Sequence, residues 1–253
     1  VDMAMHAGKI LLKNGGEIFR VEETIKRICG RFHVNHVDIF SMSHGIFVSA
    51  ENENGEAYTK VNHVPLSSSH LGIVAEVNEL SREISAGRVK LEEAEERLEK
   101  IEKIPPKKRW FQYMAAGLAS GTFALMLGSS VSEAVAAFLI GFLSYVWVLF
   151  AVKHNLSKII VNIVGGVIMT VLALAFMHIP FLPILKLDGM MVGAIMPMIP
   201  GVAFVNAIRD IADTDFLSGL VRMIDALLVF VYIAIGVGVT LSIYNTMMGG
   251  ILR

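Results

Sequence analysis

Charged residues are frequent in the first 109 positions of the chain and sparse beyond them. The first part holds 33 of the 45 charged residues and mixes short apolar runs with polar ones. In the second part, uncharged intervals of about the 20 residues that a helix needs to cross a bilayer lie at 110–132, 134–152, 159–185, 189–208 and 226–252. The pattern predicts two domains, a polar one over residues 1–104 and a membrane domain over residues 105–253.

The predicted membrane domain is all-α, with about five transmembrane helices. Composition agrees, because 54% of the residues are hydrophobic and the mean hydropathy is +0.60, which is too apolar for an ordinary soluble domain. The first apolar interval is not predicted to be a signal peptide, since a full polar domain precedes it. The predicted spans are 110–128, 131–151, 158–178, 187–207 and 217–244.

The polar domain has the pattern of a small mixed α/β domain. Apolar residues at helical spacing predict two helices separated by Gly15-Gly16, and two later helices over 71–84 and 91–103. Between these pairs, three short β-like runs are predicted as strands, at 37–42, 45–50 and 57–61. Asn54-Gly55 is a hairpin turn signal between the last two runs.

Lysine and arginine in the short loops predict the orientation. The basic residues before the first span, between the second and third spans, and around the connection of the fourth and fifth all fall on one side of the membrane. The opposite loops contribute only Lys186. The N-terminal domain of this multi-pass chain is therefore expected in the cytoplasm, with the C-terminus outside.

Few residues of the polar domain point to catalysis or to a cofactor. The single cysteine, Cys29, lies on the apolar face of a predicted helix and is expected to behave as a small hydrophobic residue. His33 and His36 lack the further ligands of a recognisable metal site, and no nucleotide-binding or nucleophile motif is present. We therefore expect no metal, no cofactor, no nucleic-acid partner and no enzymatic activity.

The stretch MPMIPGVAFVNAIRD, residues 196–210, is unusual for an apolar helix. Pro197, Pro200 and Gly201 predict a break in the fourth span, because proline removes a helical hydrogen bond and clashes with the preceding turn. Free backbone groups at membrane depth are tolerated where they are buried in protein or face a water-filled cavity. A break of this kind can bind both ends of a zwitterionic amino acid, and a simple proline kink is the alternative.

Polar residues follow the break and predict a cluster at the cytoplasmic mouth. Helical spacing places Asn206, Asp210 and Asp213 on one face. The same spacing brings Arg209 toward Asp213 and Arg222 toward Asp225. Ionisable residues at this depth line pathways, pair with one another or relay protons, whereas a salt-bridged interfacial loop would only fix the topology. The predicted substrate-pathway residues are Pro197, Pro200, Gly201, Asn206, Arg209, Asp210, Asp213, Asp215, Arg222 and Asp225.

Two stretches resemble the bacterial threonine/serine exporter family. The stronger one runs from Ile199-Pro200-Gly201-Val202 through Asn206-Ala207-Ile208-Arg209-Asp210 to Ser218-Gly219, Arg222 and Asp225. Asp225 stands where the family often has glutamate, and Ala212-Asp213-Thr214 replaces a stretch that often contains glycine. The second stretch, GGEIFRVEETIKRIC, is similar to the family's N-terminal signature, and its residues of interest are Gly16, Glu17, Arg20, Glu22 and Glu23.

The resemblance implies a subunit of a secondary exporter for small hydrophilic metabolites, threonine and serine first. A chain of 253 residues with five predicted spans is similar to the larger subunit of the family's split form, which implies a short companion membrane subunit and allows a higher oligomer. Coupling to the proton-motive force is expected to involve an acidic residue such as Asp210 or Asp225. Arg209 and Arg222 would either hold a substrate carboxylate or fix these aspartates.

Three alternatives remain open at this stage. Small dicarboxylates such as succinate could be the substrate instead of amino acids. The chain could be a membrane-anchored cytoplasmic enzyme with Glu17, Arg20 and Glu23 as its reactive group, or a scaffold or sensor. A polar cavity among the spans would favour transport, whereas a deep cleft within residues 1–104 would favour an enzyme.

Overall fold

A computed structural model describes residues 1–34, 36–51, 56–65, 69–179 and 185–248 of the chain. The chain forms two compact units. Unit 1 comprises Val1–Pro106 with Gly201–Asp225, and unit 2 comprises Lys107–Pro200 with Ala226–Arg253. Unit 1 is therefore built from two segments of the chain, and the sequence between these segments belongs to unit 2.

Unit 1 contains a three-stranded antiparallel sheet in the order β1-β2-β3. Its strands are β1 (Asp38–Met42), β2 (Gly45–Glu51) and β3 (Ala57–His63), close to the three predicted runs. Ile46 and Val48 of β2 are fully buried, as the alternation of side chains in a strand requires when one face of the sheet is covered. The predicted turn at Asn54-Gly55 lies outside the described residues.

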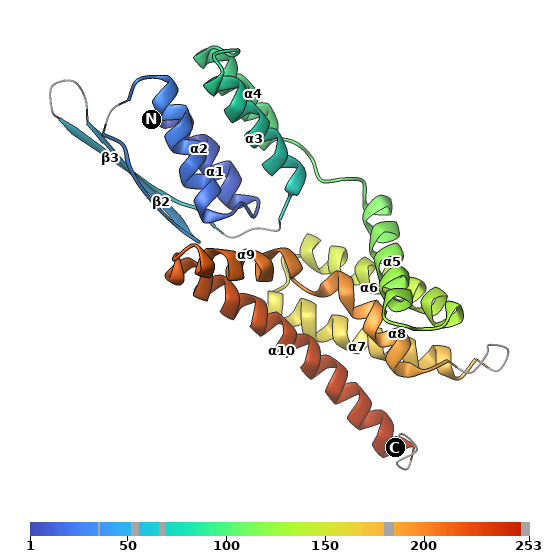
Figure 1. Ribbon diagram of the computed structural model, residues 1–253. Helices are drawn as coiled ribbons and strands as arrows, with labels where there is room; N and C mark the ends of the chain where they lie inside the picture. Colours follow the sequence, from blue (N-terminus) through green and yellow to red (C-terminus); the bar gives the residue numbers. More distant parts are fainter. Residues whose placement is uncertain (35, 52–55, 66–68, 180–184, 249–253) are drawn as a thin grey trace. The chain divides into compact units, whose positions relative to one another are not determined.

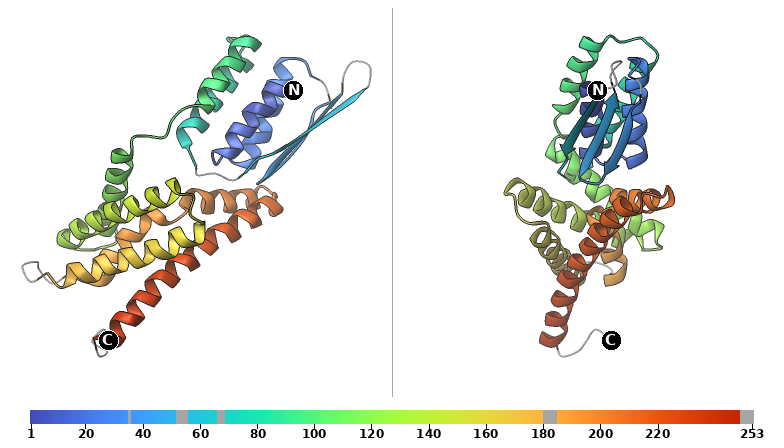
Figure 2. Two further views of the ribbon diagram at one scale, coloured as in Figure 1. Left: turned by 180° about the vertical axis from the view of Figure 1, so that it is seen from behind. Right: turned by 90° about the vertical axis from the view of Figure 1, so that its left-hand side faces the viewer.

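Four helices cover one face of this sheet in two layers (Figure 1). Helices α1 (Asp2–Lys13) and α2 (Ile18–Arg31) pack against the strands, and α3 (Leu71–Ser85) and α4 (Leu91–Glu102) pack on α1 and α2. The strands stand in front of the helices in the right-hand view of Figure 2. The sequence pattern thus predicted the order and type of these seven elements correctly.

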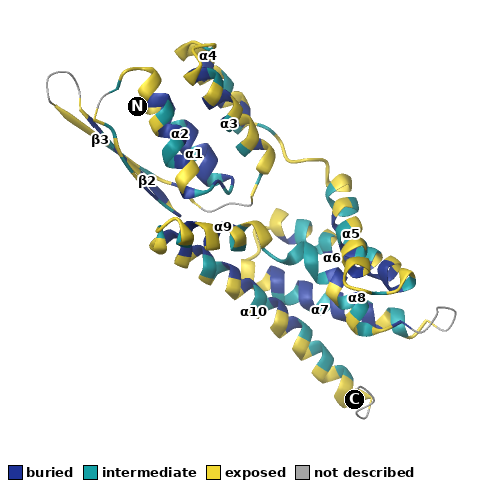
Figure 3. Cartoon of the chain, viewed as in Figure 1, coloured by how far each residue is buried: buried dark blue, intermediate teal, exposed yellow. Residues whose placement is uncertain are grey.

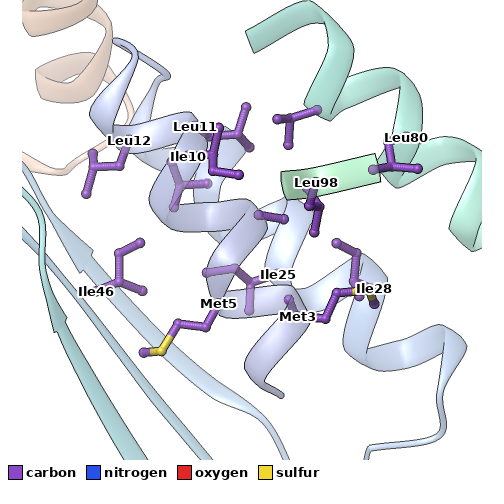
Figure 4. Packing of buried hydrophobic residues seen from close by; sticks show 14 of the residues in the cluster. Met3, Met5, Ile10, Leu11, Leu12, Ile25, Ile28, Ile46, Leu80 and Leu98 are labelled. Carbon is purple, nitrogen blue, oxygen red and sulfur yellow. The ribbon is translucent and has the colours of Figure 1, made fainter. Parts of the chain in front are cut away.

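The core of unit 1 consists of large aliphatic side chains between the two helical layers and the sheet. Figure 4 shows Ile10, Ile25 and Leu98, from three different helices, converging with Ile46 of the sheet. Each of these four side chains is fully buried. Burial of one such side chain stabilises a fold by about 1.5–3 kcal/mol, so this core accounts for the integrity of the α/β part.

A tight turn joins α1 to α2 and determines how α2 begins. Gly15 has a φ of +86°, a backbone conformation that favours glycine, and a side chain on Gly16 would lie 2.9 Å from the carbonyl oxygen of Leu11. The turn leaves Glu17 in extended conformation as the N-cap residue of α2. Because the Glu17 side chain makes no capping hydrogen bond, the first amides of α2 are available to other acceptors.

The second segment of unit 1 is a helical hairpin. It consists of α9 (Gly201–Ala212) and the first part of α10 (Phe216–Met247), up to Asp225. Gly219 permits close packing of the two helices, because a side chain there would lie 2.9 Å from the carbonyl oxygen of Ala207. In the turn between them, Thr214 has a φ of +73° and the Asp215 amide donates to the carbonyl of Asp210 at 2.8 Å.

Unit 2 contains the remaining apolar helices and the rest of α10 from Ala226 onward. Its elements are α5 (Arg109–Met126), α6 (Val131–Lys153), α7 (Lys158–Met177), α8 (Leu187–Ile195) and a 3-10 turn η1 (Met196–Met198). Many of the contacts between these helices use small residues. Where α7 crosses α10, a side chain on Gly166 would lie 2.7 Å from the carbonyl oxygen of Ile233.

Within the described part of the chain, three helices, α6, α7 and α10, are long and apolar enough to cross a membrane, or four if the α8–η1 and α9 pair counts as one broken span. Helix α5 lies where the first span is predicted but is not among them. Its 18 residues begin with the polar Arg109 and Gln112, which lower its mean hydropathy. A membrane domain of five helices therefore stays a prediction, as do the cytoplasmic position of residues 1–104 and the boundaries of the two predicted domains.

The helix predicted over 187–207 is interrupted at the prolines. Helix α8 gives way to η1, which contains Pro197, and Ile199 then adopts an extended conformation with ψ of 127°. Pro200 precedes Gly201, the first residue of α9. The physical reason is the one that the sequence suggests, since proline disfavours helical backbone in the residue before it.

Candidate functional site

The start of α2 is capped by a carboxylate that is distant in sequence and belongs to the second segment of unit 1. The amide of Ile18 donates a hydrogen bond to Oδ1 of Asp210 at 3.4 Å. Asp210 comes from α9 and is only 2% exposed. The first amides of a helix carry a partial positive charge, so a buried carboxylate is well placed there.

Arg222 completes the surroundings of this carboxylate. Its Nη1 lies 3.1 Å from Oδ2 of Asp210, and its Nη2 donates to the carbonyl oxygen of Gly16 at 3.1 Å. Arg222 lies on α10 and is 6% exposed. Two charged groups at this level of burial are stable only as a pair, so removing one partner leaves the other charge uncompensated.

A second set of polar contacts surrounds the buried pair. Asn206 of α9 donates to the carbonyl oxygen of Gly15 at 2.9 Å. Arg209 forms an ion pair with Glu17, and Arg20 Nε lies 3.4 Å from the other oxygen of the same carboxylate. We call Gly15, Gly16, Glu17, Ile18, Asn206, Arg209, Asp210 and Arg222 the loop–hairpin network. It joins the turn before α2 to the α9–α10 hairpin within unit 1.

A pair of carboxyl groups lies beside the network. Glu22 accepts a hydrogen bond from the amide of Ser41 at 2.7 Å. Burial raises the pKa of Glu22, and the nearby charge of Asp215 acts in the same direction. Burial also raises the pKa of Asp215, with a further contribution from Asp213. The turn between β1 and β2 also contacts the hairpin, because the hydroxyl of Ser43 donates to the carbonyl oxygen of Ser218 at 3.0 Å.

The structure brings many of the predicted site residues together, and the pairing of Arg209 differs from the predicted one. Arg209, expected beside Asp213, pairs with Glu17, because α9 ends at Ala212 and Asp213 is exposed in the following turn. Glu23 pairs with Arg27 along α2, while Pro197, Pro200 and Gly201 lie around the break. Asp225 lies one turn after Arg222 on α10.

Two further features have no counterpart among the predicted sites. The first is Glu133, a 5% exposed carboxylate at the start of α6, which accepts hydrogen bonds from the amides of Ser130 and Lys186 at 2.7 and 2.9 Å. It borders a polar cavity of about 240 Å³ in unit 2, next to Gly189. The signal was present in the sequence, because Glu133 is the single charged residue between Arg109 and Lys153.

The second feature is a larger cavity of about 1000 Å³ in the α/β part of unit 1. Cys29, His33 and Tyr58 are among its lining residues. Glu17, Arg20 and Glu23, the reactive group that the enzyme alternative requires, are not. Burial raises the pKa of the Cys29 thiol, which disfavours the reactive thiolate. The structure thus has a cavity in each unit, and cavities alone do not separate a transporter from an enzyme.

Helices able to span a membrane, in a chain that also forms a polar α/β unit, define a multi-pass membrane protein. The chain belongs to the family described as "Putative threonine/serine exporter", whose sequence profile matches residues 2–244. The resemblance to this family that was seen in the sequence is therefore confirmed.

A curated relative is the "Threonine/serine exporter" of Corynebacterium glutamicum, which is 23% identical over 248 residues. The match covers 96% of this chain and 51% of the relative. The chain thus spans about half the length of the curated relative that it matches. No solved structure shows significant similarity to the chain.

Proposed function

We propose that the chain is one half of a secondary exporter for small hydrophilic amino acids, with threonine and serine as the leading substrates. The observation that carries the proposal is the loop–hairpin network. It unites the two stretches that resemble the exporter family, which are about 190 residues apart, around the buried Arg222–Asp210 pair. Buried ionisable residues next to apolar helices are typical of substrate and proton pathways.

The second half of the exporter is a companion subunit in this proposal. The curated relative is about twice as long as the matched region, so a single chain there corresponds to this chain plus a second part. Secondary transporters are commonly built from paired repeats with the substrate site between them. We propose a short membrane subunit of the same family as this second part, in the bacterial inner membrane, with unit 1 on the cytoplasmic side and the C-terminus outside.

The predicted pathway residues have distinct roles in this proposal. Pro200 and Gly201 keep the helix broken, so that backbone groups near the break can contact substrate. Asp210 and Asp225 are the candidates for carrying the coupling proton, and Arg222 fixes Asp210. Arg209 and Glu17 form the outer rim of the same network.

Radiolabelled flux tests the proposal directly. Vesicles containing the chain, alone and with the companion, are loaded with threonine, serine or succinate, and efflux is followed with and without a proton gradient. We expect efflux of threonine and serine, dependent on the companion and accelerated by the gradient. Efflux of succinate alone would establish a dicarboxylate exporter instead, and no efflux of any substrate with both subunits present would contradict the proposal.

The helix break provides a matched variant for the same assay. Alanine at both Pro200 and Gly201 favours a continuous helix, and we expect flux to be lost while membrane insertion is retained. Gly238→Ala is the control for a glycine change away from the break, since a side chain there meets nothing within 4 Å. Wild-type flux in the double variant would reduce the break to a simple kink.

A further inference from the structure

The Arg222 guanidinium has the surroundings of a carboxylate-binding group. It is 6% exposed, and its two terminal nitrogens are directed at a carboxylate oxygen and a backbone carbonyl, 3.1 Å from each. A planar guanidinium binds carboxylates with two parallel donors, and desolvation strengthens this interaction. Arginine therefore supplies the charge that a free carboxylate would need at this position.

The Ile18 amide supplies a second donor on the other side of the same carboxylate. It belongs to the first turn of α2, a helix of 14 residues, whose N-cap side chain leaves the amide free for an external acceptor. Helix N-termini favour anions. Arg222 and Ile18 thus contact different oxygens of one carboxylate group, which is the arrangement in which a small free carboxylate is bound.

The carboxylate of Asp210 is only weakly hydrogen-bonded to the donors around it. Its Oδ1 accepts from Ile18 at 3.4 Å, near the outer limit for a hydrogen bond. Its Oδ2 is buried and, within the described part of the chain, makes the ion-pair contact with Arg222 but no hydrogen bond. A buried carboxylate oxygen without a hydrogen bond is costly, so Asp210 is held less firmly than the burial of the pair alone would suggest.

We propose that Arg222 and the Ile18 amide form a carboxylate subsite, which Asp210 fills in this state and which the carboxylate of the exported amino acid fills at another stage of transport. The inference rests on the proposed exporter function. It joins the two roles that the sequence left open for Arg222, since one guanidinium both fixes the aspartate and receives the substrate.

The charges around the subsite favour an amino acid over a dicarboxylate. Glu17 and Asp215 lie close enough to act electrostatically on the Asp210 position, and both carry carboxylates. Arg209 and Arg20 both pair with Glu17, on the outer side of the network. A substrate with one carboxylate and one ammonium group matches this surrounding negative charge, whereas the second carboxylate of a dicarboxylate is repelled by it.

Chemical rescue of an Asp210 variant tests the subsite. Asp210→Ala removes the resident carboxylate and leaves Arg222 and the Ile18 amide without their anion. In the purified full chain, we expect acetate or formate at about ten times its Kd to raise the unfolding midpoint of this variant by about 3 °C relative to chloride at equal ionic strength. The wild-type protein, whose subsite is filled, should show no such difference.

Two variants serve as controls. Asp38→Ala removes an exposed aspartate of unit 1 outside the network and should give no difference between acetate and chloride. Asp210→Ser keeps an acceptor for the Ile18 amide. If the alanine variant does not fold, the serine variant takes its place in the comparison of acetate with chloride. Absence of a carboxylate-specific rise in both Asp210 variants overturns the inference. So does failure of both to fold in the presence of acetate, because Asp210 would then be a fixed structural partner.

A comparison of two ligands, measured as binding to the wild-type chain with its companion, tests the subsite separately from the exporter function. Threonine should bind, and threoninol, which has a hydroxymethyl group in place of the carboxylate, should bind at least ten-fold more weakly. Equal binding of both compounds with intact threonine flux would overturn the subsite and leave the exporter standing. Rescue by acetate in a chain that exports nothing would leave the subsite standing and overturn the exporter.

Discussion

The two units bury different kinds of side chain. In unit 1, the fully buried residues are mostly large aliphatics such as Ile10, Leu80 and Leu98. In unit 2, many buried positions hold alanine, glycine or serine, as at Ala137 and Ser120. The large apolar residues of unit 2 are often outside, and Figure 3 shows exposed positions recurring along α10.

This difference follows from the solvent that each unit is suited to. Water drives large apolar side chains together, so a unit in water gains most from burying leucine and isoleucine. Lipid tails are as apolar as leucine, so helices in a membrane gain little from burying it and associate through close backbone contact at small residues. The packing of unit 2 thus supports a membrane location independently of its hydropathy.

The largest effect is expected at the buried charges of unit 1. Arg222→Ala should lower the free energy of unfolding by about 3–5 kcal/mol, because Asp210 is left buried without its partner. Arg209→Ala breaks a half-exposed ion pair and should cost about 1 kcal/mol or less. Denaturant titration of the purified variants measures both. Equal losses of unfolding free energy in the two variants would show that the burial of Arg222 does not make its ion pair more important for stability than that of Arg209.

Replacing one leucine in each unit tests the solvent argument directly. Leu80→Ala opens a cavity in the core of unit 1 and should cost about 2–5 kcal/mol. Leu118→Ala changes an exposed leucine of α5 and should have an effect within about 0.5 kcal/mol. Thermal unfolding in detergent reports the difference. A larger loss at Leu118 would mean that this face of α5 is covered in the protein.

Two neighbouring glycines of α10 test the close packing in unit 2. A side chain at Gly236 would collide with the backbone of α7 at Ile163, whereas one at Gly238 would meet nothing within 4 Å. Gly236→Ala should therefore destabilise the protein by about 1–3 kcal/mol. Gly238→Ala should be neutral or stabilising by up to about 1 kcal/mol, since alanine favours helix. We expect a lower unfolding midpoint for Gly236→Ala than for Gly238→Ala. The reverse order would contradict the packing described for α7 and α10.

The smallest effect concerns a surface ion pair of unit 1 and depends on pH. Glu102 contacts His6 at 3.0 Å and Lys13 at 3.3 Å, and the hydrogen bond from His6 holds the pKa of Glu102 below its usual range. The stability that a carboxylate with a lowered pKa contributes is present above its ordinary pKa and is lost as pH falls through the lower folded value. Below about pH 4.3, Glu102→Gln should therefore approach wild-type stability.

Unfolding midpoints measured from pH 7 down to pH 3 check this prediction. Glu99→Gln, which removes an exposed i,i+4 partner of Lys103, is the control for the loss of a surface carboxylate from the same helix. A constant difference between Glu102→Gln and the wild type over the whole range would mean that Glu102 contributes through packing and not through its charge.

Local features of the fold could be predicted from the sequence because their signals are local. The three strands and four helices of the α/β part follow from periods of two and 3.6 residues, and the break before α9 follows from Pro197 and Pro200. The span at α5 was harder, since a polar start to an apolar stretch does not define how deep the helix lies.

The candidate site could be predicted as a set of residues but not as a set of contacts. Spacing along α9 suggested Arg209 with Asp213, whereas Arg209 pairs with Glu17, which is 192 positions away. Helical periodicity contains no information on partners from another element. The Ile18 amide and the Gly16 carbonyl were missed for a similar reason, because every residue has these groups and only the tertiary fold shows which ones are used.

The contact between Gly16 and Arg222 can form only late in synthesis of the chain. The two residues are 206 positions apart, and a ribosome adding about 5–20 residues per second makes the second about 10–40 s after the first. During this interval the start of α2 lacks its contacts with Asp210 and Arg222. The apolar segment of unit 2 that precedes residue 201 is already being inserted into the membrane at this stage. A nascent chain stalled before residue 201 would therefore expose the Gly15–Ile18 turn to proteases, and completion of the hairpin would protect it.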